Sequence, residues 1–178
     1  MKNNTGQSGL TLVELMIAVS ILGIIFAVGT TTLLTHLPAM RLKSATRDLF
    51  STMMQAKTEA MRRGASVSIA FNTAGNSYIM FLDNGAGAGG IAGNGIIDGT
   101  ETILQTATVL PDKVTFVGAT TFGNNALVFT SRGIPVNGFN GGLGNGTVNL
   151  RAVDSSGNTV RQRSIAVSSA GRFGINTN

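Results

Sequence analysis

Few side chains in this chain are capable of chemistry, and their types exclude several classes of site. The sequence of 178 residues contains one His and no Cys. Without Cys there is no disulfide framework, thiolate metal site or Cys nucleophile. The lone His36 falls beside the apolar N-terminal segment, so it cannot complete a Ser–His–acid triad in the distal part of the chain. We therefore expect a protein that is not an enzyme and needs no cofactor.

Acidic and amide side chains gather in one Gly-rich segment, residues 83–101. Asn94, Gly95 and Glu101 match the positions of a calcium-binding loop that supply a ligand, a sharp turn and a closing carboxylate. The oxygen-bearing candidates for such a site are Asp83, Asn94, Asp98 and Glu101. Two earlier ligand positions of the loop have no side-chain oxygen. The favoured interpretation is therefore a metal-free loop whose Asp and Asn side chains bond their own backbone.

Arginines become frequent late in the chain, although the net charge is only +5. Alternation places Arg161 and Arg163 on one face of a strand, and Arg172 follows shortly after. Exposed guanidinium groups bind nucleic acids largely through electrostatic contacts with phosphates. A DNA-binding patch of these three arginines is a candidate site. Aromatic stacking partners are scarce, however, so a solvated face is the favoured interpretation.

The N-terminal part of the chain carries a single acid within a long apolar segment. Between residues 10 and 34 the only charged side chain is Glu14, and residues 15–40 carry none. This segment exceeds the roughly 20 residues that a helix needs to cross a bilayer. A carboxylate in lipid costs about 2.5–3.5 kcal/mol and requires a partner, which the segment does not supply. A secretory signal peptide, which would be shorter, and a plain membrane anchor, which gives no reason for Glu14, are the alternatives.

A second helical segment follows at residues 41–64. Its apolar residues recur every three or four positions, which places them on one stripe. The stripe consists of Leu42, Ala45, Leu49, Met53, Ala56 and Ala60. We expect it to pack on a sheet and to end near Gly64, because basic residues followed by Gly are typical of a helix C-terminus. We expect Pro38 to interrupt the helix, because it lacks the N–H that would bond the Leu34 carbonyl.

From residue 65 onward the pattern changes to short strands and turns. Strands are predicted at residues 67–71, 78–82, 101–110, 114–117, 127–130, 147–153 and 160–167. Residues 154–158 form a hairpin turn between the last two. The predicted fold class is α+β, with a long N-terminal helix packed on a C-terminal antiparallel β-sheet domain.

The segment GLTLVELMI, residues 9–17, resembles the processing and assembly motif of type IV pilin-like proteins. In that family a short polar leader ends in Gly, and a prepilin peptidase cuts after this Gly and methylates the new N-terminus. The resemblance implies cleavage and N-methylation at Gly9 and Leu10. It also implies that Glu14, then the fifth residue, pairs with the N-terminal amine of a neighbouring subunit during assembly.

Three later segments indicate which branch of this family the chain resembles. QAKTEAMRRG at residues 55–64, FTSRG at residues 129–133 and SAGR at residues 169–172 occur in the order found in the GspH/FimT branch. That branch contains the minor pseudopilin H of type II secretion and FimT-type minor pilins. The resemblance implies a non-enzymatic minor pseudopilin that assembles into a periplasmic pseudopilus for protein export. The alternative is a minor type IV pilin in pilus biogenesis or DNA uptake.

The resemblance also implies an organisation for the whole chain. Residues 1–9 are a leader that is removed, residues 10–40 a transmembrane and assembly helix, residues 41–64 an amphipathic helix and residues 65–178 a periplasmic β-rich domain. The protein is then a single-pass protein of the bacterial inner membrane before assembly. Its implied partners are other pilin or pseudopilin subunits, the prepilin peptidase and inner-membrane lipid, whereas DNA is not favoured.

Overall fold

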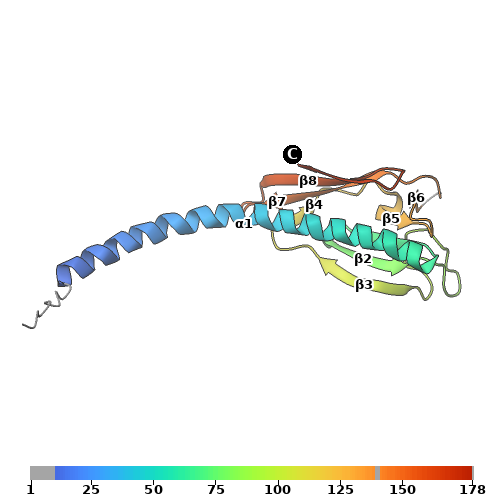
Figure 1. The fold of residues 1–178 in the computed structure, drawn as a ribbon, viewed down its shortest axis with the longest axis horizontal. Coiled ribbons are helices and arrows are strands. Elements are labelled where there is room, and N and C mark those ends of the chain that lie inside the picture. The colour runs from blue at the N-terminus through green and yellow to red at the C-terminus, as the bar shows by residue number, and fades with distance from the viewer. Residues whose placement is uncertain (1–10, 139–140, 178) are drawn as a thin grey trace, which may run out of the picture. The chain divides into compact units, whose positions relative to one another are not determined.

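The computed structural model describes residues 11–138 and 141–177, without the side chains of residues 27–35. The chain divides into two compact units, Met1–Leu37 and Pro38–Asn178. Helix α1 (Leu12–Arg63) contributes to both units and runs from blue to green in Figure 1. Within the described residues, no helix combines the length and the apolar character that crossing a membrane requires.

Pro38 lies inside α1, and the helix continues on both sides of it. The prediction that Pro38 interrupts the helix is therefore wrong. A proline removes one backbone N–H donor, whereas the hydrogen bonds of the neighbouring turns remain available to hold the helix together. The side chain of Pro38 is buried.

The second half of α1 buries the predicted apolar stripe. All six of its members are at most 3% exposed, whereas Met54 at the edge of the stripe is 43% exposed. The helix ends at Arg63, the next residue, Gly64, has a left-handed φ of +63°, and the Ala65 N–H donates to the Ala60 carbonyl oxygen at 3.3 Å. This hydrogen bond is the long one of a Schellman cap. The predicted core stripe and the predicted helix end are both confirmed.

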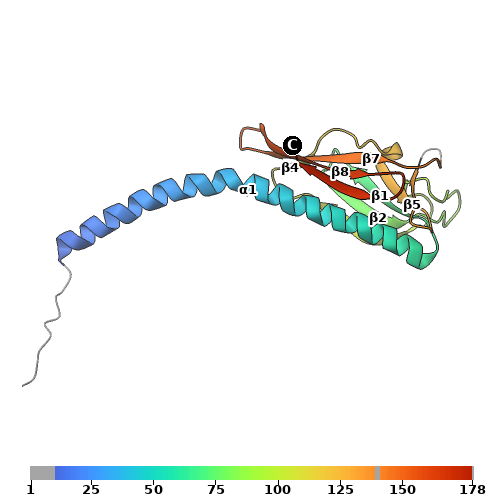
Figure 2. The same ribbon diagram turned by 45° about the horizontal axis from the view of Figure 1, so that its top comes forward.

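Two antiparallel sheets form the rest of the second unit. The first has the order β3-β2-β1-β5-β6 and the second the order β4-β7-β8-β9. The strands are β1 (Val67–Asn72), β2 (Ser77–Leu82), β3 (Thr102–Val109), β4 (Val114–Phe116), β5 (Ala126–Phe129), β6 (Pro135–Asn137), β7 (Gly146–Val153), β8 (Thr159–Val167) and β9 (Phe173–Thr177). A short 3₁₀ helix, η1 (Gly123–Asn125), precedes β5. Figures 1 and 2 show both sheets alongside the second half of α1.

The α+β class and the antiparallel pairing are confirmed, but the strands divide between two sheets and not one. β1 pairs with β2 on one side and β5 on the other, so β4 has no place beside it and pairs with β7. β6 and β9 were not predicted. β6 is short and begins with Pro135 in a Gly-rich segment, and β9 has only two alternating apolar residues, Phe173 and Ile175, too few to indicate a strand.

One hydrophobic core joins α1 to both sheets. The α1 stripe packs in a single cluster with side chains that include Phe129 of β5 and Leu150 of β7, both fully buried. Every other side chain of β7 is buried, so one face of this strand points to the core. At the β9 side, the Phe50 ring of α1 meets the Phe173 ring with centroids 5.8 Å apart.

The Gly-rich segment 83–101 covers part of the other face of the first sheet. All four residues of β5 are buried, although only one face of the strand can point to the core. A Cβ atom on Gly95 would lie 2.6 Å from the Ala126 Cβ, so the backbone of the segment passes directly over β5. Gly95 also has a φ of +74°, which an L side chain rarely adopts.

Candidate functional site

A side-chain cap fixes the start of α1. The Thr11 hydroxyl accepts a hydrogen bond from the Glu14 backbone N–H at 3.2 Å, and the Thr11 carbonyl accepts one from the Leu15 N–H at 3.1 Å. Thr11 is therefore the N-cap residue, and the Thr-x-x-Glu spacing is that of a capping box. The Thr-x-x-Glu spacing of Thr11 and Glu14 is the pattern in the sequence that indicates this cap.

Glu14 lies in the first turn of α1, where its negative charge complements the helix dipole. Its neighbours are exposed apolar side chains: Leu12 is 73% and Leu15 is 58% exposed. Among the residues that the structure describes, no cation forms an ion pair with the Glu14 carboxylate. Gly9 and Leu10 lie outside the described residues, so cleavage between them stays a prediction.

Asp83 anchors the Gly-rich segment to β1. Its fully buried carboxylate accepts hydrogen bonds from the Ser68 hydroxyl at 2.5 Å and from the backbone N–H groups of Gly93 at 2.5 Å and Gly95 at 2.8 Å. Ser68 is also fully buried. A buried carboxylate requires donors of this kind, because desolvation of the charge is otherwise very costly.

Glu101 and Asp98 hold the remainder of the segment. The Glu101 carboxylate accepts hydrogen bonds from the Gly85 N–H at 3.0 Å and the Asp98 N–H at 3.3 Å. Asp98 accepts one from the Ile91 N–H at 3.2 Å and one from the Asn94 side-chain amide at 2.7 Å. Burial raises the pKa of the Glu101 carboxyl above its ordinary value, although its two backbone hydrogen bonds act in the opposite direction.

The four calcium candidates thus hold the loop through hydrogen bonds. The carboxylates of Asp83, Asp98 and Glu101 all accept backbone N–H groups of residues 85–98, and the Asn94 side-chain oxygen accepts the Ile96 N–H at 2.8 Å. Within the described ranges, no group of three or more His, Cys, Asp or Glu side chains is arranged to hold a metal ion. This geometry is that of the favoured interpretation, a loop closed by its own side chains.

The structure separates the three candidate arginines for DNA. Arg161 and Arg163 share a face of β8, and the strand register sets them opposite Ala152 and Leu150 of β7. Arg172 lies in the turn after β8, with its carbonyl bonded to the Ser168 N–H. At 3.3 Å per strand residue, this turn lies roughly 16 Å along the strand from Arg163. Arg172 thus lies beyond the opposite end of β8 from Arg161 and Arg163, and a DNA-binding patch stays the alternative that the sequence does not favour.

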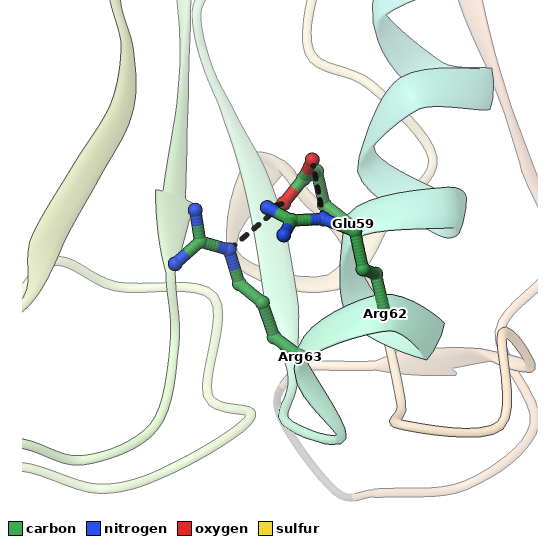
Figure 3. Close-up of polar contacts among 3 residues, drawn as sticks. All are labelled: Glu59, Arg62 and Arg63. Carbon is green, nitrogen blue, oxygen red and sulfur yellow. Dashed lines mark hydrogen bonds and ion pairs between the residues drawn. The ribbon is translucent and has the colours of Figure 1, made fainter.

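The two arginines at the end of α1 share one carboxylate of the same helix. The Glu59 carboxylate accepts hydrogen bonds from Arg62 at 2.7 Å and from Arg63 at 2.8 Å, as Figure 3 shows. The Arg62 guanidinium, more than that of Arg63, lowers the pKa of Glu59 below its ordinary value. These two arginines are thus engaged at the helix end and leave less free positive charge there for an anionic ligand.

Comparison with known proteins relates the chain to secretion and pilus subunits. A family model described as "Type II transport protein GspH" matches residues 45–171, and a model of the prokaryotic N-terminal methylation motif matches residues 4–30. No curated protein matches the chain.

Two solved structures share the fold. The minor pseudopilin EpsH from the type 2 secretion system of Vibrio cholerae has a TM-score of 0.53 at 12% identity, covering 77% of this chain and 97% of that one. The type IV minor pilin FimU of Pseudomonas aeruginosa has a TM-score of 0.50 at 19% identity, covering 76% of this chain and 87% of that one. At these identities the likeness establishes the fold alone.

Proposed function

The chain belongs to the GspH family of type II transport proteins, and from this premise we propose that it is a minor pseudopilin of a type II secretion system. It acts as a structural subunit that assembles into a periplasmic pseudopilus for protein export. The observation that carries the proposal is the GspH match over residues 45–171 in the same chain as an N-terminal methylation motif over residues 4–30. We assign the chain no catalytic residue.

The proposed maturation begins at the N-terminus. A prepilin peptidase cleaves between Gly9 and Leu10 and methylates the new amino group. The match to the N-terminal methylation motif supports this step. Because Thr11 caps α1, the new N-terminus would lie next to the helix start and close to Glu14 in sequence.

The proposed assembly step depends on Glu14. Its carboxylate sits among exposed apolar side chains and has no paired cation among the described residues. In lipid such a charge is costly, and the N-terminal amine of an adjacent subunit would offset that cost. Pairing between subunits would thus make association more favourable than the isolated monomer. Before assembly, the uncharged stretch of residues 15–40 would anchor the chain in the inner membrane, with residues 65–178 in the periplasm.

A minor type IV pilin is the second candidate, because such pilins share the N-terminal motif and FimU shares the fold. Deletion of the gene distinguishes the pseudopilin from the type IV pilin. Loss of protein export with intact pili supports the pseudopilin. Loss of pili or of DNA uptake with intact export supports the pilin.

Substitution of Glu14 tests the assembly step. We expect Glu14→Ala to reach the membrane at the wild-type level but to be reduced at least about tenfold in filaments, because the buried ion pair is lost. Ser20→Ala is the matched control, since it removes another polar group from the same helix. The measurement is the fraction of chain recovered with sheared filaments.

Two results would contradict the proposal. Normal incorporation of Glu14→Ala into filaments would show that the Glu14 carboxylate is not needed for assembly. A mature chain that begins at Met1 in cells with an active peptidase, as read by mass spectrometry, would remove the processing step.

A further inference from the structure

In the Gly-rich loop of residues 83–101, two acidic side chains are buried and three isoleucines are exposed, the reverse of the usual distribution. Its acids Asp83 and Glu101 are 0% and 9% exposed, whereas Ile91, Ile96 and Ile97 are 62%, 49% and 45% exposed. Carboxylates normally face solvent and isoleucines are normally buried. We define the three isoleucines as the isoleucine patch.

The loop backbone that presents this patch is held by Asp98, which is half-buried, and by the two buried acids. The Asp98 carboxylate bonds the Ile91 N–H, and Glu101 bonds the Asp98 N–H next to Ile97. Asp83 fixes Gly95, directly before Ile96. The three isoleucines are therefore displayed from a backbone with defined positions, which lowers the entropy that a binding partner would have to remove.

Few charged side chains lie close to the patch, and the nearest in sequence, Asp98, is hydrogen-bonded within the loop. Asn124 donates a hydrogen bond from its amide to the Asn94 carbonyl at 3.0 Å, and a Cβ atom on Gly138 would lie 2.6 Å from that oxygen. Residues 84–97, 114–131 and 133–150 contain no Asp, Glu, Lys or Arg. In a chain with a net charge of +5, the loop residues 84–97 and the residues that contact them, Asn124 and Gly138, are uncharged, which suits an uncharged protein partner.

The size of the patch limits what that partner can be. A stable interface between free proteins buries about 800 Å² on each side, more than three half-exposed isoleucines provide. A partner already held in the same assembly needs much less area, because tethering gives it a high effective concentration. A second copy is disfavoured, because two mature chains, each left with a net charge of +4 once Lys2 is removed with residues 1–9 (5 − 1 = 4), repel each other.

We propose that the isoleucine patch is the docking surface for an uncharged aliphatic face of an adjacent, different subunit in the same filament. This inference rests on the proposed function, since it requires the chain to be assembled. It gives the Gly-rich loop a role in binding a neighbouring subunit, with its buried carboxylates as the support.

Cysteine protection tests the proposal without altering the core. The chain has no Cys, so Ile96→Cys introduces a single thiol, and Val160→Cys, at a position 44% exposed on β8, is the matched control. We expect a maleimide to label Ile96→Cys at least about tenfold more slowly in filaments than in unassembled membrane-bound chain, because an interface excludes the reagent. Val160→Cys should label at similar rates in both states.

A second experiment removes the apolar surface. The triple change of Ile91, Ile96 and Ile97 to Ser should lower filament incorporation at least about tenfold at an unchanged membrane level. The same change at the exposed aliphatic residues Ile103, Val109 and Val160 should lower it less than about twofold.

The outcomes separate this inference from the proposed function. Rapid labelling of Ile96→Cys within filaments that contain the chain overturns the docking surface alone. A disulfide between two copies of Ile96→Cys overturns the choice of a different subunit. A wild-type chain that never enters filaments overturns both proposals.

Discussion

Folding shifts the pKa values of two carboxylates in this protein in opposite directions, because one is buried and the other forms ion pairs at the surface. Glu101 is nearly buried and its pKa is raised, chiefly by desolvation. Glu59 pairs with Arg62 and Arg63 at the surface and its pKa is lowered, chiefly by the Arg62 hydrogen bond. The folded state therefore holds the Glu101 proton more tightly than the unfolded state does, and the Glu59 proton less tightly.

The pH dependence of stability should show this difference in sign. The contribution of Glu101 is greatest below its ordinary pKa of 4.5 and falls as the pH rises through the raised value. The free energy of unfolding of wild type relative to Glu101→Gln should therefore decrease as the pH rises above 4.5. Denaturant unfolding across this range gives the measurement.

Glu59→Gln is the matched control for this prediction. The contribution of Glu59 is present above its ordinary pKa and is lost as the pH falls through the lowered value. The stability of wild type relative to Glu59→Gln should therefore increase with pH. Slopes of the same sign for both variants would contradict the assignment of burial to Glu101 and of ion pairing to Glu59.

At the scale of elements, α1 changes its role along its length. From Leu12 to Phe26, exposed apolar side chains predominate, whereas beyond Pro38 the stripe enters the core. The helical periodicity of residues 41–64 was sufficient to predict which side chains the sheets would cover. Burial of this stripe is the principal apolar contact between α1 and the strands.

Two adjacent methionines of α1 provide a sharp test of this packing. Met53 is 0% exposed and Met54 is 43% exposed. Met53→Ala should lower the free energy of unfolding by about 2–5 kcal/mol, because it leaves a cavity in the core. Met54→Ala should change it by less than about 0.5 kcal/mol. Equal losses in denaturant unfolding would show that the stripe is assigned to the wrong face.

At the scale of the whole molecule, every hydrophobic core residue that the structure describes belongs to the second unit. A chain that starts at Pro38 should therefore fold in water and unfold within about 3 °C of the full-length protein in detergent, since 1 kcal/mol corresponds to about 2–4 °C at this size. Proline is also well tolerated in the first turn of a helix. An unfolded fragment, seen by circular dichroism, would show that residues 1–37 contribute to the core.

Local patterns in the sequence determined the parts of this protein that depend on neighbouring residues. Each of these parts depends on residues within one short segment, because helices and strands repeat every few residues. They are the alternation within the strands, the apolar stripe of α1, the cap at Gly64 and the spacing of Glu14 from Gly9. Pro38 does not follow this local rule, because the hydrogen bonds of the turns around it hold the helix together despite one missing N–H.

The tertiary structure alone decided which distant segments meet. The composition of residues 83–101 is compatible with a metal-binding loop. In the structure this loop passes over β5, and the carboxylate oxygens of Asp83, Asp98 and Glu101 accept hydrogen bonds from backbone N–H groups. The division into two sheets and the separation of Arg172 from Arg163 were decided in the same way. These features depend on pairing between residues far apart in the chain, and a residue's type and spacing do not specify which remote partner satisfies it.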